Sequence, residues 1–346
     1  MNRPTRAAAL ALAFCLLSPF APASAQQAAF QPGAIFPADA KLESVFSGGF
    51  FLEGPAAAAD GTVYFSDITI TAQTRGHAGH VWRFDPRTGK TTLFRSPSGM
   101  NNGNRFDADG SLVSALGADF GCRCVIRTDM GTGKSSILAG LFNGRPLNSP
   151  NDLVIDRQRR IYFTDPRYYG HESIEQPVAA VYRIDPGGAV HLLIADAGKP
   201  NGIAISPDQR TLYVSSIGPP ATAQMAGNLP AAMNLNAVYA YPLAADGSVG
   251  PRRTLVDYAG RRTGIDGMAV DVEGNLYAAR VSAVPQDRGI AVFSPSGQEL
   301  AFVPTQDNPT NLGFGRGDEG RTLYVTARAN LFRIRTLMDG FHPFDK

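Results

Sequence analysis

The stretch that decides the fold, NSPNDLVIDRQRRIYFTDP, spans residues 148–166. Two apolar runs, LVI (153–155) and IYF (161–163), flank a charged turn, which is typical of a β-hairpin. Asn151 and Asp152 stand directly before the first run, although both residue types are disfavoured in strands and need polar partners if buried. A polar pair at this edge therefore indicates a role beyond strand formation.

The same pattern recurs along the chain. Six segments share a polar first residue, a short run with apolar positions, a turn and a second strand. They are EGPAAAADGTVYFSD from Glu53, NGNRFDADGSLVSAL from Asn102, NDLVIDRQRRIYFTD from Asn151, NGIAISPDQRTLYVSS from Asn201, DGMAVDVEGNLYAAR from Asp266 and NLGFGRGDEGRTLYVT from Asn311. Their first residues lie 49, 49, 50, 65 and 45 positions apart.

A second hairpin follows in most repeats, so each unit predicts a four-stranded sheet of the size of a propeller blade. Six units predict an all-β, six-bladed β-propeller over residues 41–340 as one domain. The last unit is one strand short, and KLESVF (41–46), before the first repeat, is expected to supply that strand and close the ring. The insertion 218–236, which explains the 65-residue spacing, is either a lid or a passive insertion.

The N-terminus carries an export signal. Arg3 and Arg6 precede an apolar run, and ASA (23–25) matches a cleavage site, so residues 1–25 are expected to be a signal peptide and 26–40 a linker. The mature chain is expected to be periplasmic or secreted, and no later stretch is long and apolar enough to cross a membrane.

Net charge and cysteine content limit which kinds of binding partner and metal the chain is expected to have. Removing two arginines with the signal leaves 30 basic and 30 acidic residues (32 − 2 against 30), a balance that favours neither nucleic acid nor an anionic membrane as partner. Cys122 and Cys124 remain, and without a nearby His they make a poor zinc site, so they are expected as thiols or a local bridge. The sequence does not set the oligomeric state.

In a propeller the first strand of each blade lines the central channel, so the six leading residues converge on one axis. Two carboxylates and four amides match a hard divalent cation, most simply Ca²⁺. The alternative is that these residues merely turn the chain into each strand. Glu53 is not a turn residue, which favours the cation site.

Three motifs, LNSPNDLVID, KPNGIAISPD and GIDGMAVDVEGNLY, resemble those of the regucalcin (senescence marker protein) and gluconolactonase family of calcium-dependent lactonases. The resemblance runs from FFLEGPA to LYVTARANLFRIR. It implies a metal site of Glu53, Asn151, Asn201 and Asp266, with Ca²⁺ expected and Zn²⁺ as the alternative, and hydrolysis of a sugar lactone or related cyclic ester. One difference is Ser149, which stands where regucalcin-like members carry a sugar-contacting Arg.

Asp266 is the candidate catalytic base, and it is also a candidate ligand. The candidate substrate contacts are Asn102, Asn148, Asp152 and Asn311, and Asp152 is the second candidate for the base. No G-x-S-x-G motif indicates a serine hydrolase. Two alternatives stay open, a phosphotriesterase-type hydrolase on the same scaffold and a non-enzymatic, calcium-stabilised binding module.

Overall fold

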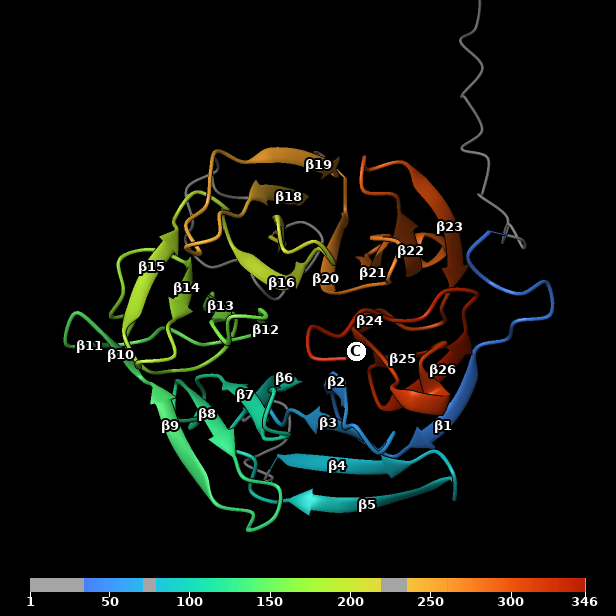
Figure 1. Cartoon of the computed structure of the whole chain (residues 1–346), viewed down its shortest axis with the longest axis horizontal. Helices are drawn as coiled ribbons and strands as arrows, with labels where there is room; N and C mark the ends of the chain where they lie inside the picture. Colours follow the sequence, from blue (N-terminus) through green and yellow to red (C-terminus); the bar gives the residue numbers. More distant parts are fainter. Residues whose placement is uncertain (1–33, 71–78, 219–234, 260, 346) are drawn as a thin grey trace, which may run out of the picture.

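The computed structural model describes residues 34–70, 79–218, 235–259 and 261–345. Within these residues, six four-stranded antiparallel sheets stand in a ring around a central axis (Figure 1), which confirms the six-bladed β-propeller. The predicted signal peptide and most of the 218–236 insertion lie outside the described residues, so both remain predictions.

Each blade runs from an inner strand at the axis to an outer strand at the rim. Blade 1 consists of β2 (Leu52–Ala57), β3 (Val63–Asp67), β4 (His80–Asp85) and β5 (Lys90–Arg95). Blade 2 consists of β6 (Asn101–Phe106), β7 (Leu112–Leu116), β8 (Cys124–Thr128) and β9 (Ser135–Ala139). Blade 3 consists of β12 (Leu153–Ile155), β13 (Ile161–Asp165), β14 (Ala180–Ile184) and β15 (Val190–Ile194).

Blade 4 consists of β16 (Pro200–Ile205), β17 (Thr211–Ser216), β18 (Ala237–Pro242) and β19 (Arg253–Asp257). Blade 5 consists of β20 (Thr263–Val270), β21 (Leu276–Ser282), β22 (Gly289–Phe293) and β23 (Glu299–Pro304). Blade 6 consists of β24 (Pro309–Phe314), β25 (Thr322–Ala327), β26 (Asn330–Arg335) and β1 (Glu43–Ser47). A two-stranded ribbon, β10 (Leu141–Phe142) with β11 (Arg145–Pro146), and two short 3-10 helices, η3 (Pro285–Asp287) and η4 (Gly317–Glu319), complete the described elements. Among them, no helix is long and apolar enough to cross a membrane.

Strand β1 closes the ring, as the incomplete sixth repeat predicts. It pairs antiparallel with β26, and Arg333 contacts Glu43 at 2.9 Å between Nε and Oε2. The segment just before β1 differs from the expected linker, because Ile35 and Phe36 are buried in the apolar cluster between blades 5 and 6. The N-terminal part of the domain therefore begins earlier than residue 41.

The apolar core lies between neighbouring blades. Tyr162 of blade 3 packs in one cluster with Val214 of blade 4, and Tyr213 of blade 4 packs in another with Ala278 of blade 5. A blade in the ring is covered on both faces, so its inner strands read as nearly continuous apolar runs. This packing holds the blades at fixed angles and so positions the residues at the axis.

The inner strands approach one another too closely for a side chain at several of the Gly positions. A Cβ on Gly54 would lie 2.2 Å from the carbonyl oxygen of Asn102, and a Cβ on Gly202 would lie 2.2 Å from that of Asp266. The Glu-Gly and Asn-Gly pairs of the repeat are therefore steric requirements of the ring. Each Gly lets the polar residue before it stand at the axis.

We expect Gly202→Ala to lower the free energy of unfolding by about 3 kcal/mol, because a buried backbone oxygen occupies the place of the new methyl group. Urea denaturation of the purified protein measures this. Gly187→Ala is the matched control, since a Cβ there meets no atom within 4 Å and the backbone needs no positive φ. Equal stabilities of the two variants would contradict the steric explanation.

Candidate functional site

Five of the six leading residues line one cavity at the end of the channel where the inner strands begin. They are Glu53, Asn102, Asn151, Asn201 and Asp266. Most of the inner strands carry a register shift near this end, for example between Glu53 and Ala56 in β2 and between Ile265 and Met268 in β20. Such bulges redirect side chains away from the regular alternation. The structure therefore brings five of the six predicted residues together at one cavity.

Hydroxyl groups on the second strands hold the leading residues in position. The Ser66 Oγ donates to the carbonyl oxygen of Asn102 at 2.6 Å, and the Thr164 Oγ1 donates to that of Asn201 at 2.7 Å. In each pair the hydroxyl comes from the blade before. These residues were missed in the sequence, although a Ser or Thr recurs as the fourth residue of VYFSD, IYFTD and LYVSS.

Glu53 is a buried carboxylate beside other acids. Its Oε2 accepts the N–H of Gly54 at 3.0 Å and the amide of Asn311 at 3.1 Å. Burial, with the nearby charge of Asp152, raises the pKa of Glu53 to about 8. Burial also raises the pKa of Asp266 well above its usual value, with Glu53 and Asp152 adding to the shift. Burial and the neighbouring acids therefore favour the protonated forms of both carboxyls when no cation is bound.

Asp152 and Asn311 lie outside the residues that line the cavity. Asp152 is fully buried, and its Oδ1 accepts the N–H of Leu153 at 2.8 Å. The amide of Asn311 lies 3.4 Å from Asp152 Oδ2, so it bridges this carboxylate to Glu53. Burial raises the pKa of Asp152, and the positive charge of Arg105 opposes that shift. This geometry shows both residues supporting the acids, while their predicted contacts with substrate stay predictions.

Asn148 stands further from the cavity. Its side-chain oxygen accepts the N–H of Gln176 at 3.1 Å, and its amide donates to the carbonyl oxygens of Gln176 and Val178. Asp165 accepts the backbone N–H groups of Asn148 and Ser149, which holds the segment that leads into β12. The structure gives Asn148 a role in anchoring the loop, and its predicted contact with substrate also stays a prediction.

Sequence reasoning missed most of the cavity wall. Phe51, Ile68, Met100, Tyr168 and Tyr169 line it, all from segments that flank the strands. The two tyrosines follow directly after the third-blade hairpin, in RYYG (167–170), and that position was the one available signal. Loop residues of this kind carry no periodic pattern, so only the closed ring brings them to the cavity.

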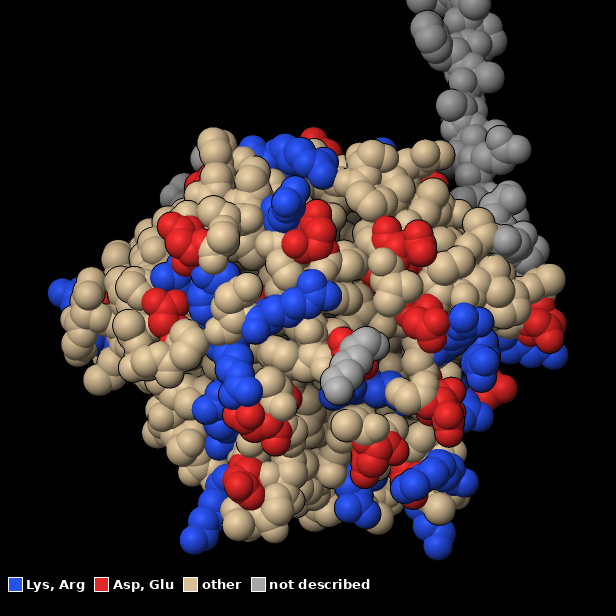
Figure 2. Space-filling model, viewed as in Figure 1, with Lys and Arg blue, Asp and Glu red and all other residues tan. Residues whose placement is uncertain are grey.

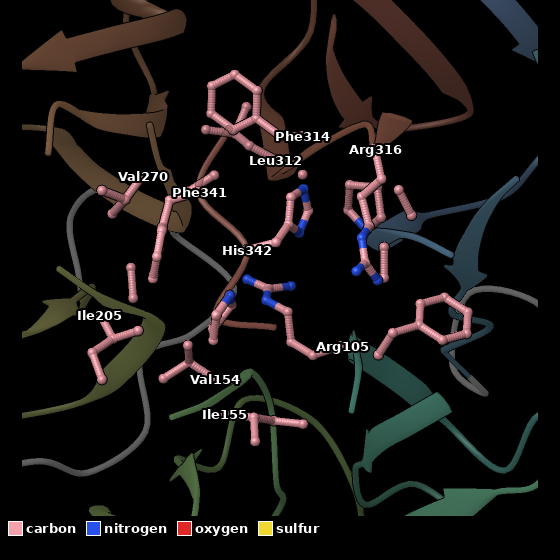
Figure 3. A pocket seen from close by; sticks show the side chains of 18 of the residues that line it. Arg105, Val154, Ile155, Ile205, Val270, Leu312, Phe314, Arg316, Phe341 and His342 are labelled. Atoms are coloured by element: carbon pink, nitrogen blue, oxygen red, sulfur yellow. The ribbon is translucent and has the colours of Figure 1, made fainter. Parts of the chain in front are cut away.

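The opposite end of the channel is covered by the end of the chain. The N–H of Phe341 donates to the carbonyl oxygen of Val270 at 2.9 Å, and His342 Nε2 donates to Gly315 O at 2.9 Å. Burial lowers the pKa of His342 to about 4, which leaves the ring neutral. Figure 3 shows Arg105, Arg316 and His342 pointing into the cavity under this segment.

The face that the C-terminal segment covers has no patch of uniform charge (Figure 2). Figure 2 shows Lys and Arg interspersed with Asp and Glu over the face on which the C-terminal segment lies. Two of the opposite charges pair across that segment, Arg321 with Asp339 at 3.1 Å and Arg316 with Asp345. These pairs fix the segment to blade 6.

The donor set fits a hard divalent cation. Glu53, Asp152 and Asp266 are three buried carboxyl groups, and burial raises the pKa of each, so a divalent cation would favour their ionised forms. The Oδ1 of Asn102 is buried without a hydrogen-bond partner in the structure, which is another free oxygen at the cavity. Within the described ranges, no three His, Cys, Asp or Glu side chains cluster as ligands, so the site depends on amide oxygens as well.

Fold and site together define a six-bladed propeller with an acidic, oxygen-rich cavity at its axis. The model of the SMP-30/Gluconolactonase/LRE-like region matches residues 51–329, and the chain belongs to this family. A gluconolactonase of Zymomonas mobilis subsp. mobilis is 29% identical over 280 residues, which cover 78% of this chain and 69% of that protein.

Two solved structures share the fold of this chain. A gluconolactonase from Xanthomonas campestris is 28% identical with a TM-score of 0.70, over 90% of this chain and 96% of that one. The calcium-binding protein regucalcin from Agrobacterium tumefaciens has a TM-score of 0.67 at 20% identity, over 88% of this chain and 97% of that one. The second likeness shows the fold alone.

We expect the free energy of unfolding of chelator-treated protein to fall as the pH rises from about 4.5 to about 8. Across this window the folded protein keeps a proton on Glu53 that the unfolded chain has lost, so rising pH favours unfolding. Glu53→Gln should make the slope shallower by up to about 1.4 kcal/mol per pH unit. Urea denaturation at several pH values in EDTA measures it.

The same denaturation series with added calcium provides the comparison. With the cation bound, the wild-type slope should flatten, because the ligand favours the ionised carboxylates. Identical slopes for wild type and Glu53→Gln in EDTA would contradict the assignment.

Proposed function

We propose that this protein is a metal-dependent lactonase that opens the ring of a sugar lactone or related cyclic ester. The observation that carries the proposal is the buried pair of carboxylates, Glu53 and Asp266, at one accessible cavity on the propeller axis. Membership of the family supports it, as does the identity with gluconolactonases.

Glu53, Asn151, Asn201 and Asp266 all line the cavity and would hold the cation. We propose calcium, because oxygen donors of this type suit it and one structural neighbour is named a calcium-binding protein. When bound, a divalent cation polarises an ester carbonyl as a Lewis acid.

Asp266 is the residue that we propose to hold the attacking water. A hydrogen bond with the Asn201 side chain orients its carboxylate. As the water oxygen bonds to the carbonyl carbon, Asp266 accepts a proton, the ring C–O bond breaks, and the proton ends on the released hydroxyl group. The product is one open-chain hydroxy acid, so atoms and charge balance.

The buried Oδ1 of Asn102 would accept a hydrogen bond from the substrate, since it has no partner within the described structure. Asp152 and Asn311 do not touch the cavity, and we propose that they keep Glu53 in place from below. Substrate would enter and product would leave at the end of the channel where Phe51, Met100 and Tyr168 line the cavity, because the C-terminal segment covers the opposite end.

We also propose that the protein is exported, as residues 1–25 predict. The structure places the sulfur atoms of Cys122 and Cys124 side by side, which is one of the two expected outcomes for this pair.

Lactone hydrolysis by purified protein tests the proposed function. Acid release from sugar and aliphatic lactones is followed by pH change, after treatment with EDTA and then after resupply of calcium or zinc. We expect turnover that requires the cation, and a loss of at least about 100-fold in kcat/KM for Asp266→Asn.

Asp129→Asn, at an outer turn of blade 2, is the control and should keep wild-type turnover. Circular dichroism shows whether each variant is folded. Folded, metal-loaded protein that hydrolyses none of the lactones would reject the function. Hydrolysis of a phosphotriester instead would assign the site to that chemistry.

A further inference from the structure

One part of the cavity wall is apolar. Phe51 and Ile68 of blade 1 line it together with Met100 and Ala118 of blade 2. Backbone hydrogen bonds hold each pair of segments in place, because the N–H of Ile68 donates to Phe51 O and that of Gly117 donates to Met100 O.

Two polar groups of the wall outside the proposed cation site already have partners. Ser149 Oγ accepts the N–H of Ala118 at 3.0 Å, and the Tyr168 hydroxyl lies 3.4 Å from the carbonyl oxygens of Lys199 and Ile217. Substrate hydroxyl groups that face the apolar part of the wall would lose water without gaining hydrogen bonds there, which disfavours a polar substituent at that place.

Two bulky apolar residues are held here in the left-handed region of backbone space. Met100 has a φ of 62° and Phe120 a φ of 69°, and the other non-Gly residues of positive φ in the described structure are polar or charged. Bulky side chains rarely adopt this conformation, and it persists only where the surrounding structure enforces it. Both residues belong to the loops that flank β7 and β6 at the cavity end of blade 2.

Specific contacts hold Met100 and Phe120 in this left-handed conformation. Glu172 accepts the N–H of Asp119 at 3.1 Å and that of Phe120 at 2.9 Å, so one carboxylate holds both residues of the turn. A Cβ on Gly121 would lie 2.8 Å from the Cβ of Met100, which shows that the turn lies directly on that residue.

The turn presents Phe120 to solvent, two residues after Ala118, which lines the cavity. Phe120 is 73% exposed and its ring packs against His171 with centroids 4.2 Å apart. An exposed aromatic ring held in a strained turn this close in the chain to an apolar wall is suited to contact an apolar part of a substrate.

We infer that the substrate is a lactone with an apolar substituent on its ring, which lies along Phe51, Ile68 and Met100 and reaches Phe120. This inference rests on the proposed lactonase function and narrows its substrate class. Met100 and Phe120 then set specificity through contacts with the substituent, and they take no part in the chemistry.

Three lactones test the inference: δ-decalactone with its alkyl chain, unsubstituted δ-valerolactone and D-glucono-1,5-lactone. We expect wild-type kcat/KM to be at least about tenfold higher for δ-decalactone than for either other lactone. Met100→Asn and Phe120→Asn replace an apolar contact with a side chain that tolerates positive φ. We expect the ratio of kcat/KM for δ-decalactone over δ-valerolactone to fall about tenfold in the first and about threefold in the second.

Ile137→Asn is the matched control, because Ile137 is a 67% exposed apolar residue on the outer strand β9 of the same blade. Its ratio should stay at the wild-type value. Faster hydrolysis of gluconolactone than of δ-decalactone, or an unchanged ratio in both variants, would overturn the inference and leave the lactonase function standing. Hydrolysis of none of the three lactones would reject the function and this inference together.

Discussion

The closeness of the six inner strands around one axis is the constraint on which the site depends. At Gly54 and Gly202 the neighbouring backbone stands where a Cβ would be, so the chain must carry Gly there. The polar residue before each Gly has no freedom to move away from the axis. The close packing of the inner strands therefore places carboxylates and amides together. Hydroxyl groups of the second strands hold them there by donating hydrogen bonds to the backbone of Asn102 and Asn201.

The axis is layered by charge. The cavity and its acids lie at one end of the axis. Next along the axis, the amide of Asn311 bridges Glu53 and Asp152, and Arg105 lies deeper in the channel. The C-terminal segment then covers the far end. This order shows how a protein of balanced charge keeps several acids near one axis: Asn311 donates to two of them, and Arg105 opposes the pKa shift of Asp152.

Much of this arrangement could be predicted because it repeats. The six polar residues, the four-stranded units and the closing strand follow from a period that recurs along the chain, and β1 pairs with β26 as the short sixth repeat requires. Asn148, in contrast, was predicted near the substrate from its neighbourhood in the sequence. The structure points its side chain at Gln176 and Val178, because loop hydrogen bonds follow from tertiary contacts that have no period.

The architecture, the closure of the ring and the polar residues at the axis could all be predicted from the amino-acid sequence, since they follow from a local pattern that recurs along the chain. Three features emerge only in the folded protein: Asp152 and Asn311 lie behind the cavity, Met100 and Tyr168 line it, and the C-terminal segment covers the other end of the channel. These features join single, unrepeated segments that are distant in the chain. Their contacts form only once the ring of blades has closed, so no local sequence pattern predicts them.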